Sequence, residues 1–376
     1  MNFRFYYRQS SLLTHGMNKS PVFNLAERVI YFFAHLFAPS FAHVFVRTVQ
    51  GPNIAFLLSL VLLSCAGSLS ANSQDQSPPA SSVLDSADYR STPGVYGTIT
   101  SVGSDTLAGL MAIWAQRFQE LYPHIKFQIQ ATGSATASQA LTQGSANIGP
   151  MSRVMNAQEI ANFTRRHGYP PTALVVAIDA IALYVEKNNP VTQLTLAELD
   201  ALFSITRLCG GESPINQWSQ LGVSKFGEKK QIQLFGRNSA SGTYDLFKQR
   251  ALCDGDFLRT VNEMPSSSSV VQSVASSIGG MGYAALGYTN NNVKTIALSR
   301  NGKTYYSPSP ENLREGNYPF TRNLYIIVNK APDSPIPVLE RTFLRFILSP
   351  EGQQIVLENG YFAVSERLVQ RQLLKL

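Results

Sequence analysis

The chain has 376 residues, of which 44% are hydrophobic and 15% charged, so it can bury a sizeable core and is long enough for two domains. The formal net charge of +7 does not indicate a nucleic-acid-binding protein. Five cations and one acid before residue 65 supply +4 of it, which leaves +3 for the rest. No run of basic and aromatic residues follows, and we expect no nucleic acid partner.

The predicted leader covers residues 1–65. Its last part, Ile54–Leu63, is an apolar run too short for a comfortable membrane span, and Ser64 and Cys65 follow it. This ending is similar to a bacterial lipoprotein cleavage site, which predicts that Cys65 becomes a lipidated N-terminus. Ordinary signal cleavage near Ala71, with loss of Cys65, is the alternative. Both predict a periplasmic or cell-surface protein.

Residues 66–94 are rich in Ser, Gln, Pro and Asp, a composition that predicts a flexible tether. Because the leader predicts export, Cys209 and Cys253 are expected to lie in an oxidising compartment. In an oxidising compartment a pair of cysteines favours a disulfide, and two buried free thiols are the alternative. His124 and His167 have no metal-ligand spacing around them, so we expect no metal and no cofactor.

From residue 96 the pattern alternates between strands and helices. Strands are predicted at 96–102, 126–130 and 146–149, and helices at 107–121 and 135–143. Turns rich in Gly, Ser and Thr lead from strand to helix, and the loop 151–153 follows the third strand. This order is typical of a parallel α/β sheet whose strand ends carry the ligand.

The middle of the chain predicts a second unit. A long apolar run at 173–185 is expected to cross between the units as a strand, and 323–328 is expected to return. The elements expected between these two runs are helices at 196–203, 244–252 and 266–275, and strands at 230–235, 282–286 and 295–298. Helices at 338–348 and 351–358 then complete the first unit.

Three turns rich in Gly, Ser and Thr, at 103–107, 133–137 and 239–243, each open a predicted helix. The N-terminus of a helix offers unpaired N–H groups and roughly half a positive charge. Three such ends directed at one point would hold a desolvated oxyanion. Any one of these turns alone would more commonly be only a helix cap.

These motifs and their order resemble the periplasmic phosphate-binding proteins of ABC transporters, which have the two-domain type II periplasmic binding protein fold. The resemblance covers roughly residues 95–365. It implies an α/β fold with domain I at 95–180 and 323–376, domain II at 181–322, and a hinge of two crossing strands near 180–185 and 324–328. It also implies inorganic phosphate and ABC transporter permease subunits as partners, and we expect a monomer.

Carried over position by position, the resemblance implies contacts between this chain and the anion. The implied ligand residues are Thr106, Leu107 through its N–H, Ser134, Ser152, Arg237, Ser241, Gly242 through its N–H, and Thr243. Ser104 and Arg153 are further candidates, with Arg153 contacting either the anion or the opposite domain. Apart from Arg237 and Arg153, every candidate is a hydroxyl or a backbone N–H, a set that suits a small tetrahedral anion.

Two positions depart from the family pattern. Ser152 stands where many members have an aspartate that accepts the proton of bound phosphate, so selectivity over sulfate must come from other acceptors. Ser239 stands where an aspartate can pair with the binding arginine, so less local neutralisation is expected around Arg237.

We expect no enzyme, because the sequence has no catalytic motif around Ser241. A surface-anchored binding module without a transport role and a phosphate-ester hydrolase are the alternatives.

Overall fold

The computed structural model describes residues 93–224 and 230–376. The predicted leader 1–65, its Cys65, and nearly all of the predicted tether 66–94 lie outside the described residues. Among the helices of the described part, none is both long and apolar enough to cross a bilayer.

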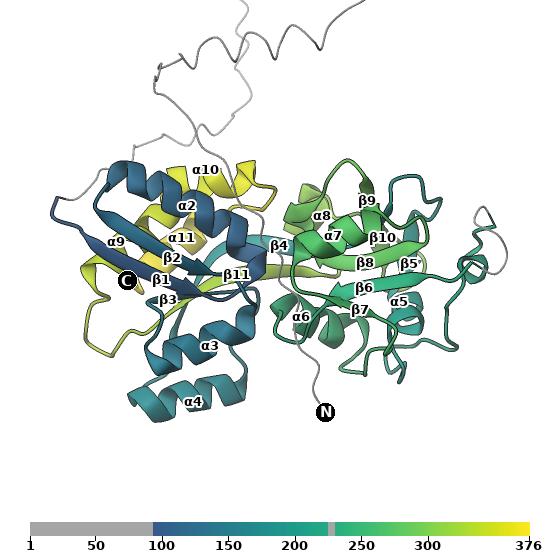
Figure 1. The fold of residues 1–376 in the computed structure, drawn as a ribbon, viewed down its shortest axis with the longest axis horizontal. Coiled ribbons are helices and arrows are strands. Elements are labelled where there is room, and N and C mark those ends of the chain that lie inside the picture. Colours follow the sequence, from purple (N-terminus) through teal and green to yellow (C-terminus); the bar gives the residue numbers. More distant parts are fainter. Residues whose placement is uncertain (1–92, 225–229) are drawn as a thin grey trace, which may run out of the picture. The chain divides into compact units, whose positions relative to one another are not determined.

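The described residues build a nine-stranded mixed sheet in the order β2-β1-β3-β11-β4-β8-β6-β7, with β9 paired to β4 (Figure 1). Its strands are β1 Gly97–Val102, β2 Ile125–Gln130, β3 Ile148–Met151, β4 Thr172–Glu186, β6 Gln233–Arg237, β7 Asn262–Met264, β8 Gly280–Ala285, β9 Val293–Thr295 and β11 Thr321–Val328. A separate parallel pair consists of β5 Gln193–Thr195 and β10 Ala297–Ser299.

Strand β4 is the element that joins two lobes. Residues 172–180 of β4 pair with β11, whereas residues 181–185 pair with β8. We call residues 93–180 and 321–376 the first lobe and residues 181–320 the second lobe. β4 is almost continuously apolar because helices cover both faces of the sheet along its length.

The return crossing lies earlier than the predicted hinge segment 324–328. The carbonyl of Phe320 accepts the Ile181 N–H at 3.1 Å, and pairing of β11 with β4 begins at Thr321. Residues 324–328 pair with β4, and 325–328 also pair with β3, so they belong to the sheet of the first lobe. That hinge assignment was therefore wrong for the second strand. The domain boundaries themselves stay a prediction.

The first lobe has helices on both faces of its sheet (Figure 1). On one face lie α2 Ala108–Leu121, α9 Val338–Ile347, α10 Pro350–Glu358 and α11 Glu366–Leu373; on the other lie α3 Ser134–Gln143 and α4 Ala157–His167. Trp114, Phe118 and Phe343 fill the first core. Leu141 and Phe163 fill the second.

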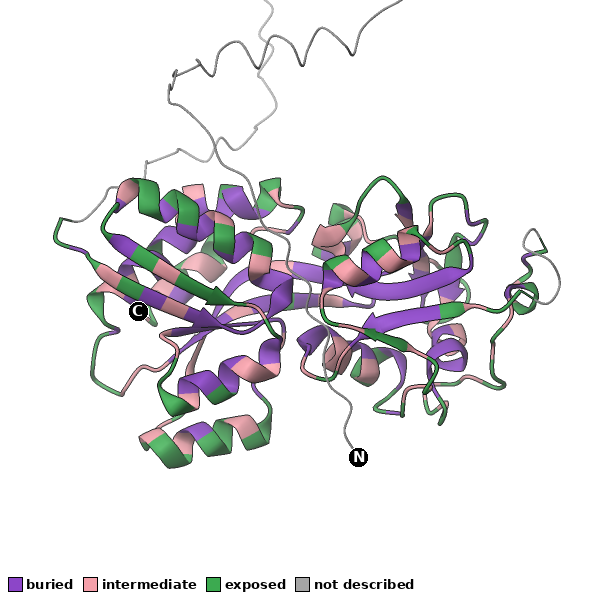
Figure 2. Cartoon of the chain, in the orientation of Figure 1, coloured by how far each residue is buried: buried purple, intermediate pink, exposed green. Residues whose placement is uncertain are grey.

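The second lobe repeats this layering. Its helices are α5 Leu196–Phe203, α6 Gly242–Ala251, α7 Ser267–Ala275 and α8 Pro310–Arg314, with short 3-10 turns at η2 Trp218–Leu221 and η3 Leu286–Tyr288. Phe203 and Phe247 pack in one core with Tyr283, and Val270 and Val274 pack in the other. Figure 2 shows the buried central strands between helices that are exposed on their outer sides.

Helices α4, α8 and α11 and strands β5 and β7 escaped the sequence prediction, and the strand predicted at 295–298 is two strands that part at Ile296. Helix α4 is mostly polar and buries one side chain, Phe163, so no long apolar stripe marks it. The sequence features that mark this helix lie at its two ends. Asn156 and Glu159 form a capping box, and Gly168 ends the helix in the left-handed conformation.

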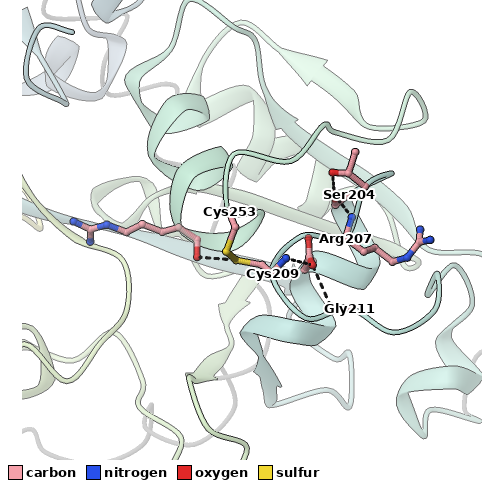
Figure 3. Close-up of a disulfide and its surroundings, with 8 residues drawn as sticks. Ser204, Arg207, Cys209, Gly211 and Cys253 are labelled. Carbon is pink, nitrogen blue, oxygen red and sulfur yellow. Dashed lines mark hydrogen bonds between the residues drawn. A yellow bond between two sulfur atoms is a disulfide. The ribbon is translucent and has the colours of Figure 1, made fainter. Parts of the chain in front are cut away.

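A disulfide joins Cys209 and Cys253, and so ties the loop after α5 to the segment after α6 (Figure 3). The buried Asp200 carboxylate accepts the Cys209 N–H at 2.6 Å and the Gly211 N–H at 3.1 Å. This loop is therefore held both covalently and by a charged acceptor that its own N–H groups satisfy.

Replacing Cys209 and Cys253 together by Ser should lower the free energy of unfolding by about 2–4 kcal/mol, because the bridge spans 44 residues and restricts the unfolded chain. Urea denaturation of the oxidised protein and the variant measures the difference. Adding reductant to the variant is the control and should change nothing. Equal midpoints for the oxidised protein and the variant would contradict the expectation.

Candidate anion-binding site

The three turns predicted to hold an anion meet where the two lobes face each other. They follow β1, β2 and β6, and they lead into η1 Asp105–Leu107, α3 and α6. Thr106 Oγ1 of the first lobe lies 3.3 Å from Thr243 Oγ1 of the second. The Ala135 N–H donates to the Ala240 carbonyl at 3.1 Å, again across the lobes. The lobes are therefore in contact at these turns.

Two serine hydroxyls of the first lobe face the start of α6. The Ser134 Oγ accepts the Ser152 N–H at 3.0 Å and lies 3.2 Å from the Ser152 Oγ. A Cβ added to Gly242 would lie 2.6 Å from the Ser152 Oγ and 2.7 Å from the Ser134 Oγ. Only a glycine allows this approach. Both hydroxyls therefore lie against the first residue of α6, at the helix end whose N–H groups have no acceptor within the helix.

The other predicted residues of these turns, Leu107, Ser241 and the further candidate Ser104, are buried. Ser241 is the N-cap of α6, and its Oγ accepts the Thr243 N–H at 3.1 Å. Leu107 ends η1 and precedes α2. The Ser104 hydroxyl is buried and has no hydrogen-bond partner among the described residues. An unpaired buried hydroxyl costs free energy, so it is available to a ligand at little further cost.

Arg237 pairs with a carboxylate that the sequence reasoning did not assign. Its Nη1 and Nη2 donate to the two oxygens of Asp105 at 2.7 and 2.8 Å, across the lobes. The Ser267 N–H donates to Asp105 Oδ2 at 3.0 Å. The expectation of weak neutralisation around Arg237 was wrong, because the first lobe supplies the carboxylate that is missing at Ser239.

The guanidinium of Arg237 is fully committed to protein acceptors. Besides Asp105, its Nη1 donates to Ser267 Oγ at 3.1 Å, its Nη2 to the Pro265 carbonyl at 2.9 Å, and its Nε to the Met264 carbonyl at 3.3 Å. A guanidinium has five N–H donors, so all five are used. In this arrangement Arg237 links the lobes, and contact with an anion would require it to give up one of these bonds.

A second buried guanidinium, Arg322, lies at the crossing between the lobes. Its Nε and Nη2 donate to Asp179 Oδ2 at 2.9 and 2.7 Å. Its Nη1 donates to Thr243 Oγ1 at 3.0 Å and its Nη2 to Thr106 Oγ1 at 3.3 Å. Burial raises the pKa of Asp179, and Arg322 opposes that rise. Arg322 thus contacts both hydroxyls that meet across the lobes.

Arg153 contacts the opposite lobe. Its Nε donates to Asp245 Oδ2 at 2.5 Å, in the first turn of α6, and its Nη1 and Nη2 donate to Glu159. Burial alone would raise the pKa of Glu159, but hydrogen bonds from Arg153 and the Asn156 N–H lower it overall. Of the two roles considered for Arg153, the structure shows the contact between lobes.

Two tyrosines hold the first turn in place. Tyr361 donates to the Thr106 carbonyl at 2.6 Å, and Tyr288, from the second lobe, donates to the Asp105 carbonyl at 2.7 Å. Burial raises the pKa of Tyr288 to about 12 and also raises that of Tyr361, so both stay protonated donors at neutral pH. The backbone of the first turn is therefore held from both lobes.

Two open surface hollows lie on the first lobe. One of about 580 Å³ is lined by residues between 135 and 166, and one of about 330 Å³ by residues between 100 and 145. All of these residues belong to the first lobe, so neither hollow is shared between the lobes. Among the described residues there is no group of three or more His, Cys, Asp or Glu side chains placed to hold a metal ion.

Sequence reasoning missed Asp105, Asp179 and Arg322. Asp105 lies inside the first turn and could have been weighed as a partner for Arg237. Asp179 lies within the run 173–185 that was predicted to cross between the units, and it was given no role in the site. Nothing around Arg322 marks it, because it is one basic residue at the start of a strand, and only the crossing of the chain brings it to the two threonines.

A sheet that continues from one lobe to the other through β4, with donor-rich turns meeting between the lobes, defines a type II periplasmic binding protein. In agreement, a family model described as a PBP superfamily domain matches residues 89–351. The phosphate-binding protein PstS of Pseudomonas aeruginosa is 48% identical over 290 residues, which are 77% of this chain and 90% of that protein. The chain belongs to the periplasmic phosphate-binding proteins of this superfamily.

Solved structures show the same fold. An ABC-type phosphate transport receptor from Vibrio cholerae has a TM-score of 0.55 at 23% identity, over 71% of this chain and 100% of that one. A substrate-binding protein from Clostridium perfringens, solved with bound phosphate, has a TM-score of 0.60 at 24% identity, over 72% of this chain and 100% of that one.

Replacing Arg237 by Ala should destabilise the fold by about 3–5 kcal/mol, because it leaves the buried Asp105 carboxylate without its partner. The double variant Asp105→Asn/Arg237→Gln removes both charges, so its free energy of unfolding should fall clearly less than that of Arg237→Ala. Urea denaturation measures both. An Arg237→Ala protein as stable as the parent, or a double variant as unstable as the single one, would show that the pair is not formed as described.

Proposed function

We propose that this protein captures inorganic phosphate between its two lobes and delivers it to an ABC transporter. The observation that carries the proposal is the convergence of buried donors from both lobes on one point. The proposed ligands are Thr106, the Leu107 N–H, Ser134, Ser152, Ser241, the Gly242 N–H and Thr243, with Ser104 as a further candidate. The 48% identical relative, named as a phosphate-binding protein, supports the choice of anion.

The chemistry of these groups fits a small tetrahedral anion. Hydroxyl and N–H donors can surround four oxygens, and the N-termini of α3 and α6 add a favourable field. Hydrogen bonds to a charged group contribute about 1.5–3 kcal/mol each. Several of them, offset by the cost of removing water from the anion, are compatible with micromolar binding, which corresponds to about 8 kcal/mol.

Arg237 was predicted to contact the anion, and the structure suggests a different role for it. We propose that Arg237 stabilises the closed arrangement through Asp105, and that Arg153 does the same through Asp245. Both pairs join side chains of opposite lobes. Residues that meet only when the lobes touch favour closure over the ligand, and so slow its release.

We propose a binding role without catalysis. The Ser241 hydroxyl, the nucleophile that a hydrolase would need, caps α6 by accepting the Thr243 N–H. His124 is exposed, and His167 lies at the end of α4 beside Asn329. Incubation with a chromogenic phosphate ester tests this part of the proposal, and turnover by the purified protein would overturn it.

We further propose that the protein is monomeric and acts outside the cytoplasm, tethered to the membrane through lipid on Cys65. The apolar run before Cys65 and the Ser- and Pro-rich segment after it support the anchor. Recovery of the protein in the detergent phase, lost in a Cys65→Ser variant, would support lipidation. Partition into the aqueous phase in both cases would favour ordinary signal cleavage.

Calorimetric titration of the purified protein tests the function directly. Phosphate and arsenate should bind with similar, micromolar or tighter affinity, because both are tetrahedral anions of the same charge. Sulfate should bind more weakly, because it has no proton to donate to an acceptor in the site. Both oxygens of Asp105 already accept hydrogen bonds from Arg237, so we assign this selectivity to hydroxyl acceptors such as the one on Ser152. Molybdate completes the panel. Sulfate binding tighter than phosphate, or no phosphate binding, would contradict the proposal.

Replacing Gly242 by Ala should abolish or strongly weaken phosphate binding, by at least about 100-fold, and leave the fold intact. The added methyl group belongs to the second lobe but meets Ser134 and Ser152 of the first, so it obstructs closure rather than folding. Calorimetry and thermal unfolding measure the two effects.

Gly109→Ala is the matched control. It also lies near the start of a helix, has nothing within 4 Å of its added Cβ, and is exposed. It should bind phosphate like the parent and be slightly more stable, because alanine favours helix. Equal phosphate affinity in both variants would mean that the ligand does not lie between the lobes at Gly242.

A further inference from the structure

The feature that the proposed function leaves unused is Arg322. Its side chain is buried at the crossing between the lobes, and it pairs with Asp179, which is fully buried. It is the guanidinium that contacts hydroxyls from both turns at once, Thr106 from the first lobe and Thr243 from the second. No family motif identified in the sequence includes Arg322.

The direction of these hydrogen bonds is fixed by chemistry. A guanidinium can only donate, so the Thr106 and Thr243 hydroxyls must both accept from Arg322. A hydroxyl carries one proton, which must then be directed elsewhere. The two hydroxyls lie 3.3 Å apart, so at most one of them can donate to the other. The second proton needs another acceptor.

The two arginines of the site differ in this respect. All five N–H donors of Arg237 have acceptors in the protein. Arg322 donates to Asp179 through Nε and one Nη2 proton. Its other Nη2 proton is donated to Thr106 and one Nη1 proton to Thr243. One Nη1 proton has no acceptor among the described residues. Arg322 therefore keeps a donor that Arg237 lacks.

We propose that Arg322 is a positioning residue for the anion: it holds the Thr106 and Thr243 hydroxyls as acceptors, so that their protons are presented to phosphate oxygens. Because one threonine comes from each lobe, this arrangement is complete only in the closed protein. At these two hydroxyls it favours anion oxygens that carry no proton, so the remaining proton of phosphate is left to another acceptor, such as the Ser152 hydroxyl. The inference rests on the proposed function.

A double-mutant cycle tests this coupling. The first change is the paired substitution Asp179→Asn/Arg322→Gln, which avoids leaving a buried carboxylate alone and keeps side chains of similar shape. The second is Thr243→Val. Each should weaken phosphate binding by about 10- to 100-fold. Together they should weaken it little more than the larger single effect, because one change removes the Thr243 hydroxyl and the other removes the group that orients it.

Arg250→Gln is the matched control. Arg250 donates to the Pro319 and Thr321 carbonyls beside the same crossing, and it has no hydrogen bond to the hydroxyl of Thr106 or Thr243. It should bind phosphate within about twofold of the parent, a change of less than about 0.5 kcal/mol. Thermal unfolding of every variant verifies that the fold is retained.

The pH profile separates orientation from a merely structural role. In the parent, phosphate affinity should rise as pH increases from 6 to 8.5, because the second ionisation of phosphate removes the proton that oriented donors cannot accept. In Asp179→Asn/Arg322→Gln the threonine hydroxyls are free to turn and accept, so the profile should flatten.

Additive losses in the cycle, or parallel pH profiles, would overturn this inference while leaving phosphate binding by the parent intact. A parent that does not bind phosphate would instead overturn the proposed function. The two failures are therefore distinguishable in the same set of titrations.

Discussion

The contact between Asp105 and Arg237 is the interaction on which the site depends. It joins a turn of the first lobe to a strand end of the second, and it is shielded from water. An ion pair in such a place gains stability only when both charges find good geometry and further hydrogen bonds, and here the Ser267 N–H and two backbone carbonyls provide them. This ion pair therefore fixes how the two lobes contact each other, and it keeps the Thr106 hydroxyl of the first lobe beside the Thr243 hydroxyl of the second.

The turns were predictable because their chemistry is local. Glycine, serine and threonine after a strand and before a helix predict donor-rich caps, and the parallel order of strands predicts that these caps share one edge. The alternation of strands and helices was recovered for the same reason, with the long strand β4 marked by its unbroken apolar run. The particular residues Thr106, Ser134, Ser152 and Thr243 were named from the family resemblance. In the structure the hydroxyls of Thr106 and Thr243 lie 3.3 Å apart and those of Ser134 and Ser152 lie 3.2 Å apart.

What escaped prediction depends on contacts between distant residues. Arg322 lies 216 residues after Thr106, and no local pattern could relate them. Asp105 was visible inside a motif, but its pairing with Arg237 is a property of two lobes in contact. Helix α4 was missed for a different reason. It is mostly polar, packs a single aromatic side chain against the sheet, and is marked chiefly by its caps.

The disulfide of the second lobe has a consequence for how α6 carries its donors. The bond fixes the end of the helix opposite to Gly242, and Asp200 secures the loop to which it is tied. The helix and its cap therefore travel with the second lobe as one stiff unit when the lobes open and close. The disulfide orders this end of α6 once, when it forms during oxidative maturation. Each cycle of capture and release then carries no further cost in conformational entropy for ordering it.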